Sequence, residues 1–182
     1  MIHQLADGYH VRGLRESDLA GPYPSWFEDQ EVCKYNSHGK FFRNAQWFRE
    51  FYDGLNREDQ VVWAICHEDD GHIGNVSLQS ISSINRNAEY AILIGNRNHW
   101  RKSAGLNASL ALLRHSFEKL NLERIYCGTA SGNMGMQRLA HRMGMIEEGR
   151  RRKHLFLDGG WQDMVEYGVL RDDFLGMQSS PK

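Results

Sequence analysis

A short basic segment from Gly95 to Gly105 contains the residues best suited to hold a charged group. It follows an apolar stretch and precedes a long amphipathic pattern, so we expect it to open a helix. Backbone N–H groups at a helix start lack partners, and the helix dipole favours anions there. Its basic and small residues are Arg97, Arg101, Lys102, Ser103, Ala104 and Gly105. The pattern predicts a pyrophosphate site, and an ordinary loop with solvated charges is the alternative.

A histidine in a polar loop is a candidate proton carrier. His38 ends the segment Tyr35-Asn36-Ser37-His38, which is dense in hydrogen-bonding groups. Imidazole titrates near neutral pH, so it accepts and returns protons under ordinary conditions. The alternative is a simply solvated loop histidine.

Several other site classes are excluded or disfavoured. The chain contains no Gly-x-x-x-x-Gly-Lys-Ser/Thr loop and no Gly-x-Gly-x-x-Gly after a predicted strand, which argues against nucleoside triphosphates and dinucleotides. His67 and His72 flank an acidic turn, but their spacing matches no standard ligand set, so we predict no metal. The run from Arg150 to His154 alternates between the faces of a predicted strand without stacking aromatics, so nucleic-acid binding is not expected.

The elements that position these residues follow from hydrophobic periodicity. Strands are predicted at 9–14, 60–67, 72–79, 88–94, 124–129, 146–157 and 162–170. Helices are predicted from 44 to about 56, from 105 to 120 and from 133 to 143, and a short helical segment precedes Phe27. The order strand, helix, strand around the basic segment predicts a parallel crossover, and two hairpins make the rest of the sheet antiparallel.

Composition supports one soluble domain over residues 1–182, with a core at about 9–171 and a flexible tail at 172–182. The 182 residues are 41% hydrophobic and 25% charged, with a formal net charge of -1, so no global field attracts nucleic acid or an anionic membrane. Three widely spaced cysteines form no disulfide framework, and neither a signal peptide nor a membrane span is visible. A reducing cytoplasm is therefore expected.

The order of elements resembles the GNAT family of N-acetyltransferases over nearly the whole chain. Trp100-Arg101-Lys102-Ser103-Ala104-Gly105 stands where that family has Arg/Gln-x-x-Gly-x-Gly/Ala, and Asn133 stands at the family's asparagine. Trp100 and Ser103 depart from this pattern. Met136 replaces a frequent serine, and Ala140 replaces a tyrosine that protonates the leaving thiolate in many relatives.

The resemblance implies an α/β (α+β) fold with about four helices and a mixed, mostly antiparallel, twisted sheet of six or seven strands, the central ones splayed. It implies acetyl-CoA as co-substrate, with the pantetheine arm along the backbone of the buried strand. The implied cofactor residues are Ile92, Leu93, Ile94, Arg101, Lys102, Ser103, Ala104, Gly105, Leu106 and Asn133.

Glu89 on the buried strand and His38 are the two candidate bases for accepting the proton of an attacking amine. The alternative for Glu89 is an ion pair with an arginine on the sheet face. The polar residues assigned to acceptor binding are Tyr35, Asn36, Gln79 and Tyr90.

The segments 21–27 and 31–38 resemble the subgroup of ribosomal-protein N-terminal acetyltransferases and, more narrowly, amino-sugar nucleotide N-acetyltransferases. The predicted reaction is direct transfer from acetyl-CoA to a primary amine in a ternary complex. The acceptor is a small molecule such as a sugar nucleotide. The alternatives are acetylation of a protein N-terminus and a binding module without turnover. The protein is predicted to act as a monomer or homodimer, without nucleic acid or membrane partners.

Overall fold

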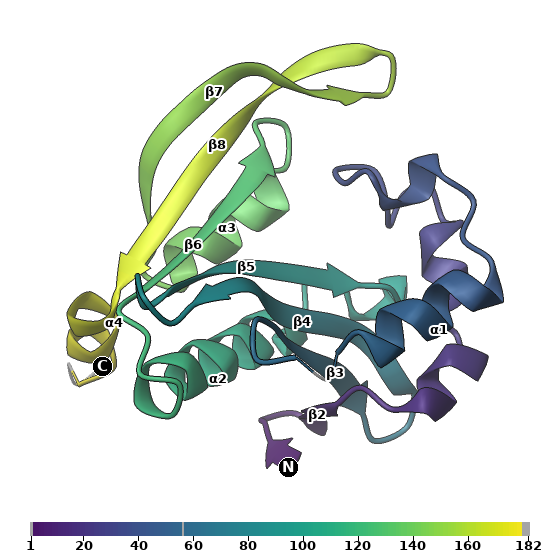
Figure 1. Cartoon of the computed structure of the whole chain (residues 1–182), viewed down its shortest axis with the longest axis horizontal. Coiled ribbons are helices and arrows are strands. Elements are labelled where there is room, and N and C mark those ends of the chain that lie inside the picture. Colours follow the sequence, from purple (N-terminus) through teal and green to yellow (C-terminus); the bar gives the residue numbers. More distant parts are fainter. Residues whose placement is uncertain (1, 56, 180–182) are drawn as a thin grey trace.

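The computed structural model describes residues 2–55 and 57–179, which form one eight-stranded sheet with helices on both faces (Figure 1). The strand order is β1-β2-β3-β4-β5-β6-β8-β7. The strands are β1 (Ile2–Gln4), β2 (Tyr9–Gly13), β3 (Val61–His67), β4 (Gly71–Ser82), β5 (Asn87–Ile94), β6 (Arg124–Ala130), β7 (Ile146–Leu157) and β8 (Gly160–Leu170). The α-helices are α1 (Ala45–Asp53), α2 (Ala104–Glu118), α3 (Met134–Arg142) and α4 (Arg171–Ser179), and the 3-10 turns are η1 (Glu16–Ala20), η2 (Pro24–Phe27), η3 (His38–Lys40) and η4 (Arg97–His99).

The middle of the sheet contains the predicted parallel crossover. β5 continues through α2 into β6, and these two strands pair in parallel, whereas the other neighbouring strands pair antiparallel. The parallel pairing covers only Asn87 to Glu89 on β5. Because β5 runs on to Ile94 and β6 to Ala130, the two strands separate after this short contact.

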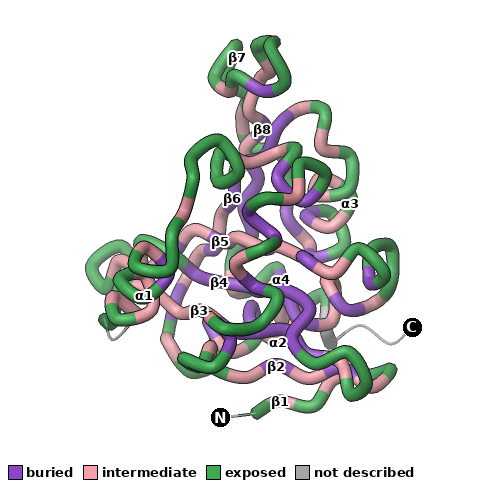
Figure 2. Tube along the Cα trace, turned by 90° about the vertical axis from the view of Figure 1, so that its right-hand side faces the viewer, coloured by how far each residue is buried: buried purple, intermediate pink, exposed green. Residues whose placement is uncertain are grey.

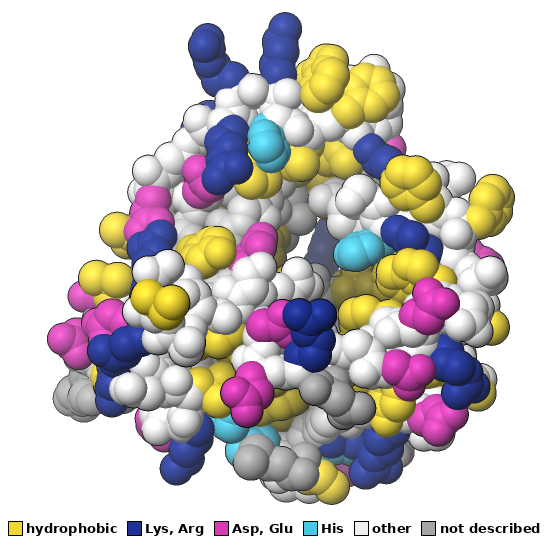
Figure 3. All heavy atoms as spheres, in the orientation of Figure 1, with side chains coloured by type: hydrophobic (Ala, Val, Ile, Leu, Met, Phe, Trp, Pro, Cys, Tyr) yellow, Lys and Arg dark blue, Asp and Glu magenta, His cyan; other side chains and the backbone are white. Residues whose placement is uncertain are grey.

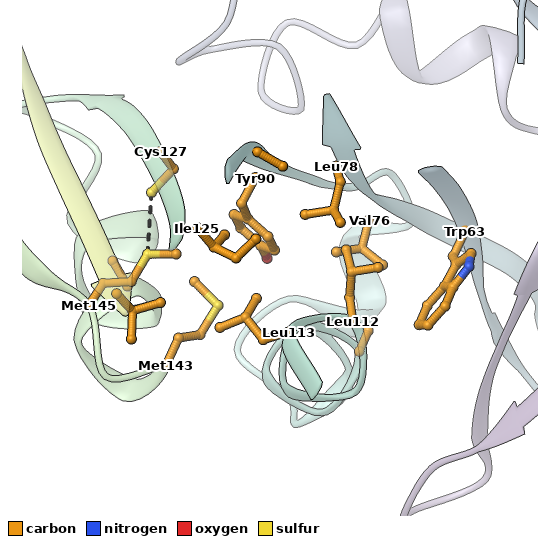
Figure 4. Packing of buried hydrophobic residues seen from close by; sticks show 14 of the residues in the cluster. Trp63, Val76, Leu78, Tyr90, Leu112, Leu113, Ile125, Cys127, Met143 and Met145 are labelled. Carbon is orange, nitrogen blue, oxygen red and sulfur yellow. Dashed lines mark hydrogen bonds between the residues drawn. The ribbon is translucent and has the colours of Figure 1, made fainter. Parts of the chain in front are cut away.

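The larger core lies between the sheet and helices α2 and α3 (Figure 4). The apolar stripe of α2 supplies Leu112, Leu113 and Phe117, all fully buried, and the sheet supplies Val76 and Ile125. Each such side chain contributes about 1.5–3 kcal/mol when it leaves water. This packing fixes the start of α2 beside the end of β5.

A second, aromatic core covers the opposite face and tethers the N-terminal half of the chain. Trp26 and Phe27 from η2 pack with Phe48 from α1 and contact Leu93 on β5. A Cβ atom on Gly95 would lie 1.8 Å from the Trp26 ring, so only glycine fits at the end of β5. Figure 2 shows buried segments of the central strands between these two layers.

Three features differ from the sequence predictions. The sheet has eight strands because the three-residue β1, too short for a visible alternation, pairs with β2. The predicted end of the first long helix near Asn56 lies outside the described residues, and α1 ends at Asp53. Residues 171–179 form α4 in place of the expected flexible tail, whose last residues 180–182 also lie outside the described part. In the described part of the chain, no helix is both long enough and apolar enough to cross a bilayer.

Candidate active site

The separation of β5 and β6 opens an unpaired edge in the middle of the sheet. From Tyr90 to Ile94, β5 pairs with β4 on one side, while its pairing with β6 has ended at Glu89. A free strand edge offers backbone N–H and C=O groups to an extended ligand. Ile92, Leu93 and Ile94, the residues assigned to the pantetheine arm, lie along this edge.

The basic segment lies where this free edge meets the first turn of α2. Arg101 adopts a left-handed backbone with φ of 61°, and Arg101 and Lys102 are exposed. The Trp100 indole Nε1 donates a 2.8 Å hydrogen bond to the Ile94 carbonyl, which ties the loop to the strand end. Trp100 therefore performs a structural task at the position where the family pattern has Arg or Gln.

Gly105 is not required by the fold itself. A Cβ atom at this position would meet Ile92 Cδ1 at 3.6 Å, an ordinary van der Waals contact. Gly105 thus differs from Gly95, where a side chain cannot fit. A small residue on an accessible first helical turn suits close approach of a ligand to the backbone.

Not every predicted cation is available to a phosphate. Arg97 lies 3.8 Å from the Asp29 carboxylate and 5.6 Å from the Trp100 ring, so it links the loop to the N-terminal segment.

The Ser103 hydroxyl donates a 2.6 Å hydrogen bond to the Asp7 carboxylate. Asp7 therefore places a negative charge at the edge of the proposed pyrophosphate site, which sequence reasoning missed because the two residues are 96 positions apart.

Asn133 is the N-cap of α3, where its side-chain oxygen accepts a 3.1 Å hydrogen bond from the Met136 amide. Ala140 is fully buried in the main core, so no hydroxyl reaches the site from this position.

Glu89 lies at the point where β5 and β6 part. Gln79 on β4 and Tyr126 on β6 are its direct strand partners, so these three side chains share the face opposite α2. No ion pair involves Glu89 among the described residues. By contrast, Glu166 lies 2.6 Å from Arg151.

The charge of Glu89 also reaches the other face of the sheet. Burial, and to a smaller extent the nearby Glu89 carboxylate, raise the pKa of Cys127 to about 12. The Cys127 thiol therefore stays protonated in the core, where it contacts the Met145 sulfur at 3.6 Å (Figure 4). Cys127 is not a nucleophile in this arrangement.

The loop between η2 and α1 reaches the C-terminal half of the sheet. Tyr35 approaches Gly132, where a Cβ atom would lie 3.6 Å from the Tyr35 ring, and Lys40 donates a hydrogen bond to the Phe156 carbonyl on β7. Figure 3 shows a hollow in this face of the molecule, between the β7–β8 side above and the loop side at the right. The loop therefore borders the sheet face that contains Glu89.

His38 and Asn36 lie in this loop. The Asn36 side chain accepts a 2.9 Å hydrogen bond from the His38 backbone amide, and the His38 ring packs edge-on against Phe27 at 5.4 Å. Partial burial and then the Arg43 charge lower the pKa of His38 below its usual value. His38 is thus neutral at physiological pH, the form that a general base requires.

The remaining acceptor residues have different environments. Gln79 lines a surface pocket of about 390 Å³ beside α1, together with Phe51 and Arg57. Tyr90 points into the core, where its hydroxyl contacts Ser109 Oγ on α2 at 2.5 Å. The predicted contact between the Tyr90 side chain and an acceptor does not fit this placement, because alternation along β5 directs Tyr90 away from the face of Glu89.

Comparison with known proteins identifies the fold and its chemistry. The model of the acetyltransferase (GNAT) domain family matches residues 10–146. The chain belongs to the GNAT family. It is 29% identical over 131 residues to the putative ribosomal N-acetyltransferase YdaF of Bacillus subtilis (strain 168), covering 71% of this chain and 68% of that protein.

Two further similarities concern polyamine enzymes. Spermidine N(1)-acetyltransferase of Vibrio cholerae is 29% identical over 142 residues, covering 72% of this chain and 82% of that protein. The crystal structure of spermidine N-acetyltransferase from Vibrio cholerae with CoA and spermine superposes with a TM-score of 0.83 at 24% identity, covering 92% of this chain and 98% of that chain.

This GNAT protein is an acetyl-CoA-dependent N-acetyltransferase. Three further residues on the sheet face of Glu89, Tyr126, Gly128 and Glu166, were not found by sequence reasoning. Their only signal is strand register: Tyr126 is opposite Glu89, and Gly128 is opposite Glu166.

Proposed function

We propose that Glu89 accepts the proton of a cationic primary amine, which then attacks the acetyl-CoA thioester in the space between β5 and β6. The observation that supports this most directly is the unpaired carboxylate of Glu89 at the point where the strands part. An amine must be neutral to act as a nucleophile, and a carboxylate both attracts the ammonium form and removes its proton, directly or through water.

The other steps use groups already described. The amine nitrogen forms a bond to the thioester carbon, and the carbonyl oxygen gains negative charge that backbone N–H groups of the free β5 edge stabilise. The tetrahedral intermediate then expels the coenzyme A thiolate. Since Ala140 offers no hydroxyl, the thiolate takes a proton from water or from the protonated base. The cradle of residues 101–106 and Asn133 hold the cofactor throughout.

Polyamines are the first acceptor class to test. The Vibrio cholerae relative is named for spermidine acetylation, and the loop across the acceptor face favours a slender small molecule over a folded protein surface. Amino-sugar nucleotides are the second class. Arg152 and Lys153 are exposed on β7 near this face and form no ion pair among the described residues, so they are available to a phosphate.

An acceptor panel separates these classes. Release of free thiol from acetyl-CoA is measured with spermidine, a UDP-linked amino sugar and a peptide with a free N-terminal amine, each at matched concentration. We expect turnover with spermidine above that with the other two. Turnover with the peptide alone would replace the small-molecule proposal by N-terminal acetylation, and turnover with the amino-sugar nucleotide alone would select the second class.

The role of Glu89 is tested by Glu89→Gln, which keeps the size and removes the base. We expect kcat to fall by about 10²-fold or more, while the Kd for acetyl-CoA is unchanged. Glu118→Gln, on the solvent side of α2, is the matched control and should retain full activity. Wild-type turnover in Glu89→Gln, combined with a large loss in His38→Gln, would transfer the role of base to His38.

A further inference from the structure

A cluster of metal-ligating side chains lies behind the pyrophosphate loop, away from the acceptor face. It consists of His67 at the end of β3, Asp70 in the β3–β4 turn and His99 in η4. Their ligand atoms all lie within 4.8 Å of one another. His72, which the sequence pairs with His67 across the turn, is instead buried against Asn75 and Asp18.

The distances suit a tetrahedral ion. Asp70 Oδ2 lies 2.9 Å from His99 Nε2 and 3.5 Å from His67 Nδ1. With metal–ligand bonds of about 2.1 Å, two ligands of a tetrahedral zinc ion are separated by about 3.4 Å. The three side chains therefore need only small rotations to receive an ion between them.

The surroundings of His99 fix its orientation. Its ring is 2% exposed, and its Nδ1 lies 2.9 Å from the Tyr9 hydroxyl, which leaves Nε2 facing the cluster. A metal-bound histidine usually donates its second N–H to a partner of this kind. The Asp70 side chain is 49% exposed, so an ion can enter and keep a water in its fourth position.

Local charge favours a cation. Asp69 lies 4.0 Å from His67. Arg101 and Lys102 belong to the loop that follows His99, but they are exposed and form no ion pair with these carboxylates among the described residues. Two neutral imidazoles with one carboxylate are typical ligands of Zn²⁺.

We propose that His67, Asp70 and His99 bind one divalent transition-metal ion, with Zn²⁺ preferred. The ion joins the β3–β4 turn to the loop that starts α2, and it has no part in the acetyl transfer itself. This departs from the sequence prediction of no metal, because His99 is 29 residues from Asp70 and its approach depends on the fold.

The test is calorimetric titration of ZnCl₂ into untagged, EDTA-treated full-length protein, repeated with Asp70→Asn and His67→Gln. Both substitutions are at partly exposed positions, so the fold should persist, and circular dichroism checks this. We expect one site per chain, weakened about tenfold or more in each variant. Asp158→Asn, in the remote turn between β7 and β8, is the control and should bind like the wild type.

A second readout reports coordination geometry. Co²⁺ in place of Zn²⁺ should give the intense visible absorption of a tetrahedral site in the wild type and lose it in Asp70→Asn. Zn²⁺ should also raise the melting temperature of the wild type by more than that of Asp70→Asn at the same concentration. Absence of binding by the wild type, or binding by His67→Gln and Asp70→Asn as tight as that of the wild type, would overturn the proposal.

Discussion

At the residue scale, the site joins groups that the sequence names with groups that only the fold supplies. The cradle residues 101–106 and Glu89 follow from local pattern and family resemblance. The Asp7 contact with Ser103 depends on pairing between distant segments, which no local pattern encodes. The orientation of Tyr90 was predictable in principle, because strand alternation places it and Glu89 on opposite faces.

The negative charge of Asp7 beside the cradle should weaken cofactor binding. Asp7→Asn keeps a hydrogen-bond acceptor for Ser103 and removes the charge, so we expect the Kd for acetyl-CoA to fall about two- to fivefold at low salt. The gain should shrink at high salt because ions screen the repulsion. Calorimetric titration at two salt concentrations measures both effects.

Asp158→Asn is the matched control for this substitution. Asp158 has a positive φ of 49°, close to the 60° of Asp7, and lies in the remote turn between β7 and β8. It should leave the Kd unchanged. An Asp7→Asn variant with unaltered or weaker binding at low salt would show that Asp7 does not face the pyrophosphate.

At the element scale, the long periodic segments were predictable and the short ones were not. The α2 stripe and the buried β5 strand give strong signals because each pattern repeats over several turns or residues. β1 has three residues, and α4 is rich in polar residues, so their positions depend on tertiary contacts. In α4, Phe174 is fully buried and packs at 5.3 Å from Phe117.

The burial of Phe174 predicts that removing its ring lowers the stability of the protein strongly. Phe174→Ala should lower the free energy of unfolding by about 3–5 kcal/mol, because it opens a cavity in the main core. Urea denaturation followed by circular dichroism measures this change. Asp172→Ala, exposed on the same helix, should change stability by less than about 0.5 kcal/mol. Equal stabilities for both variants would mean that residues 171–179 behave as a free tail.

At the scale of the whole molecule, one sheet lies between two packed cores, and the loop between η2 and α1 borders the sheet face that contains Glu89. Four histidines share one property: burial is the main cause that lowers their pKa below 6.5. They are His10, His38, His72 and His115. The fold thus holds imidazoles in their neutral form, which composition alone does not reveal.

These lowered pKa values predict a loss of stability in mild acid. Below about pH 6.5 the unfolded chain binds protons at these histidines before the folded chain does, so protonation favours unfolding. The free energy of unfolding should fall as pH decreases from 7 toward 5, and then level off once the folded-state pKa values are passed. Urea denaturation across this range measures the slope. Stability that stays constant or rises over the range would contradict the lowered pKa values of these histidines.

We propose that acetyl-CoA binds with its pyrophosphate on the first turn of α2. Calorimetric titration with acetyl-CoA tests this, comparing the wild type with Gly105→Glu, whose carboxylate fills and repels the phosphate site. Gly160→Glu, in the β7–β8 hairpin, is the control for added charge. We expect micromolar binding by the wild type and the control, and none by the folded Gly105→Glu variant. Undiminished binding by Gly105→Glu would place the cofactor elsewhere on the molecule.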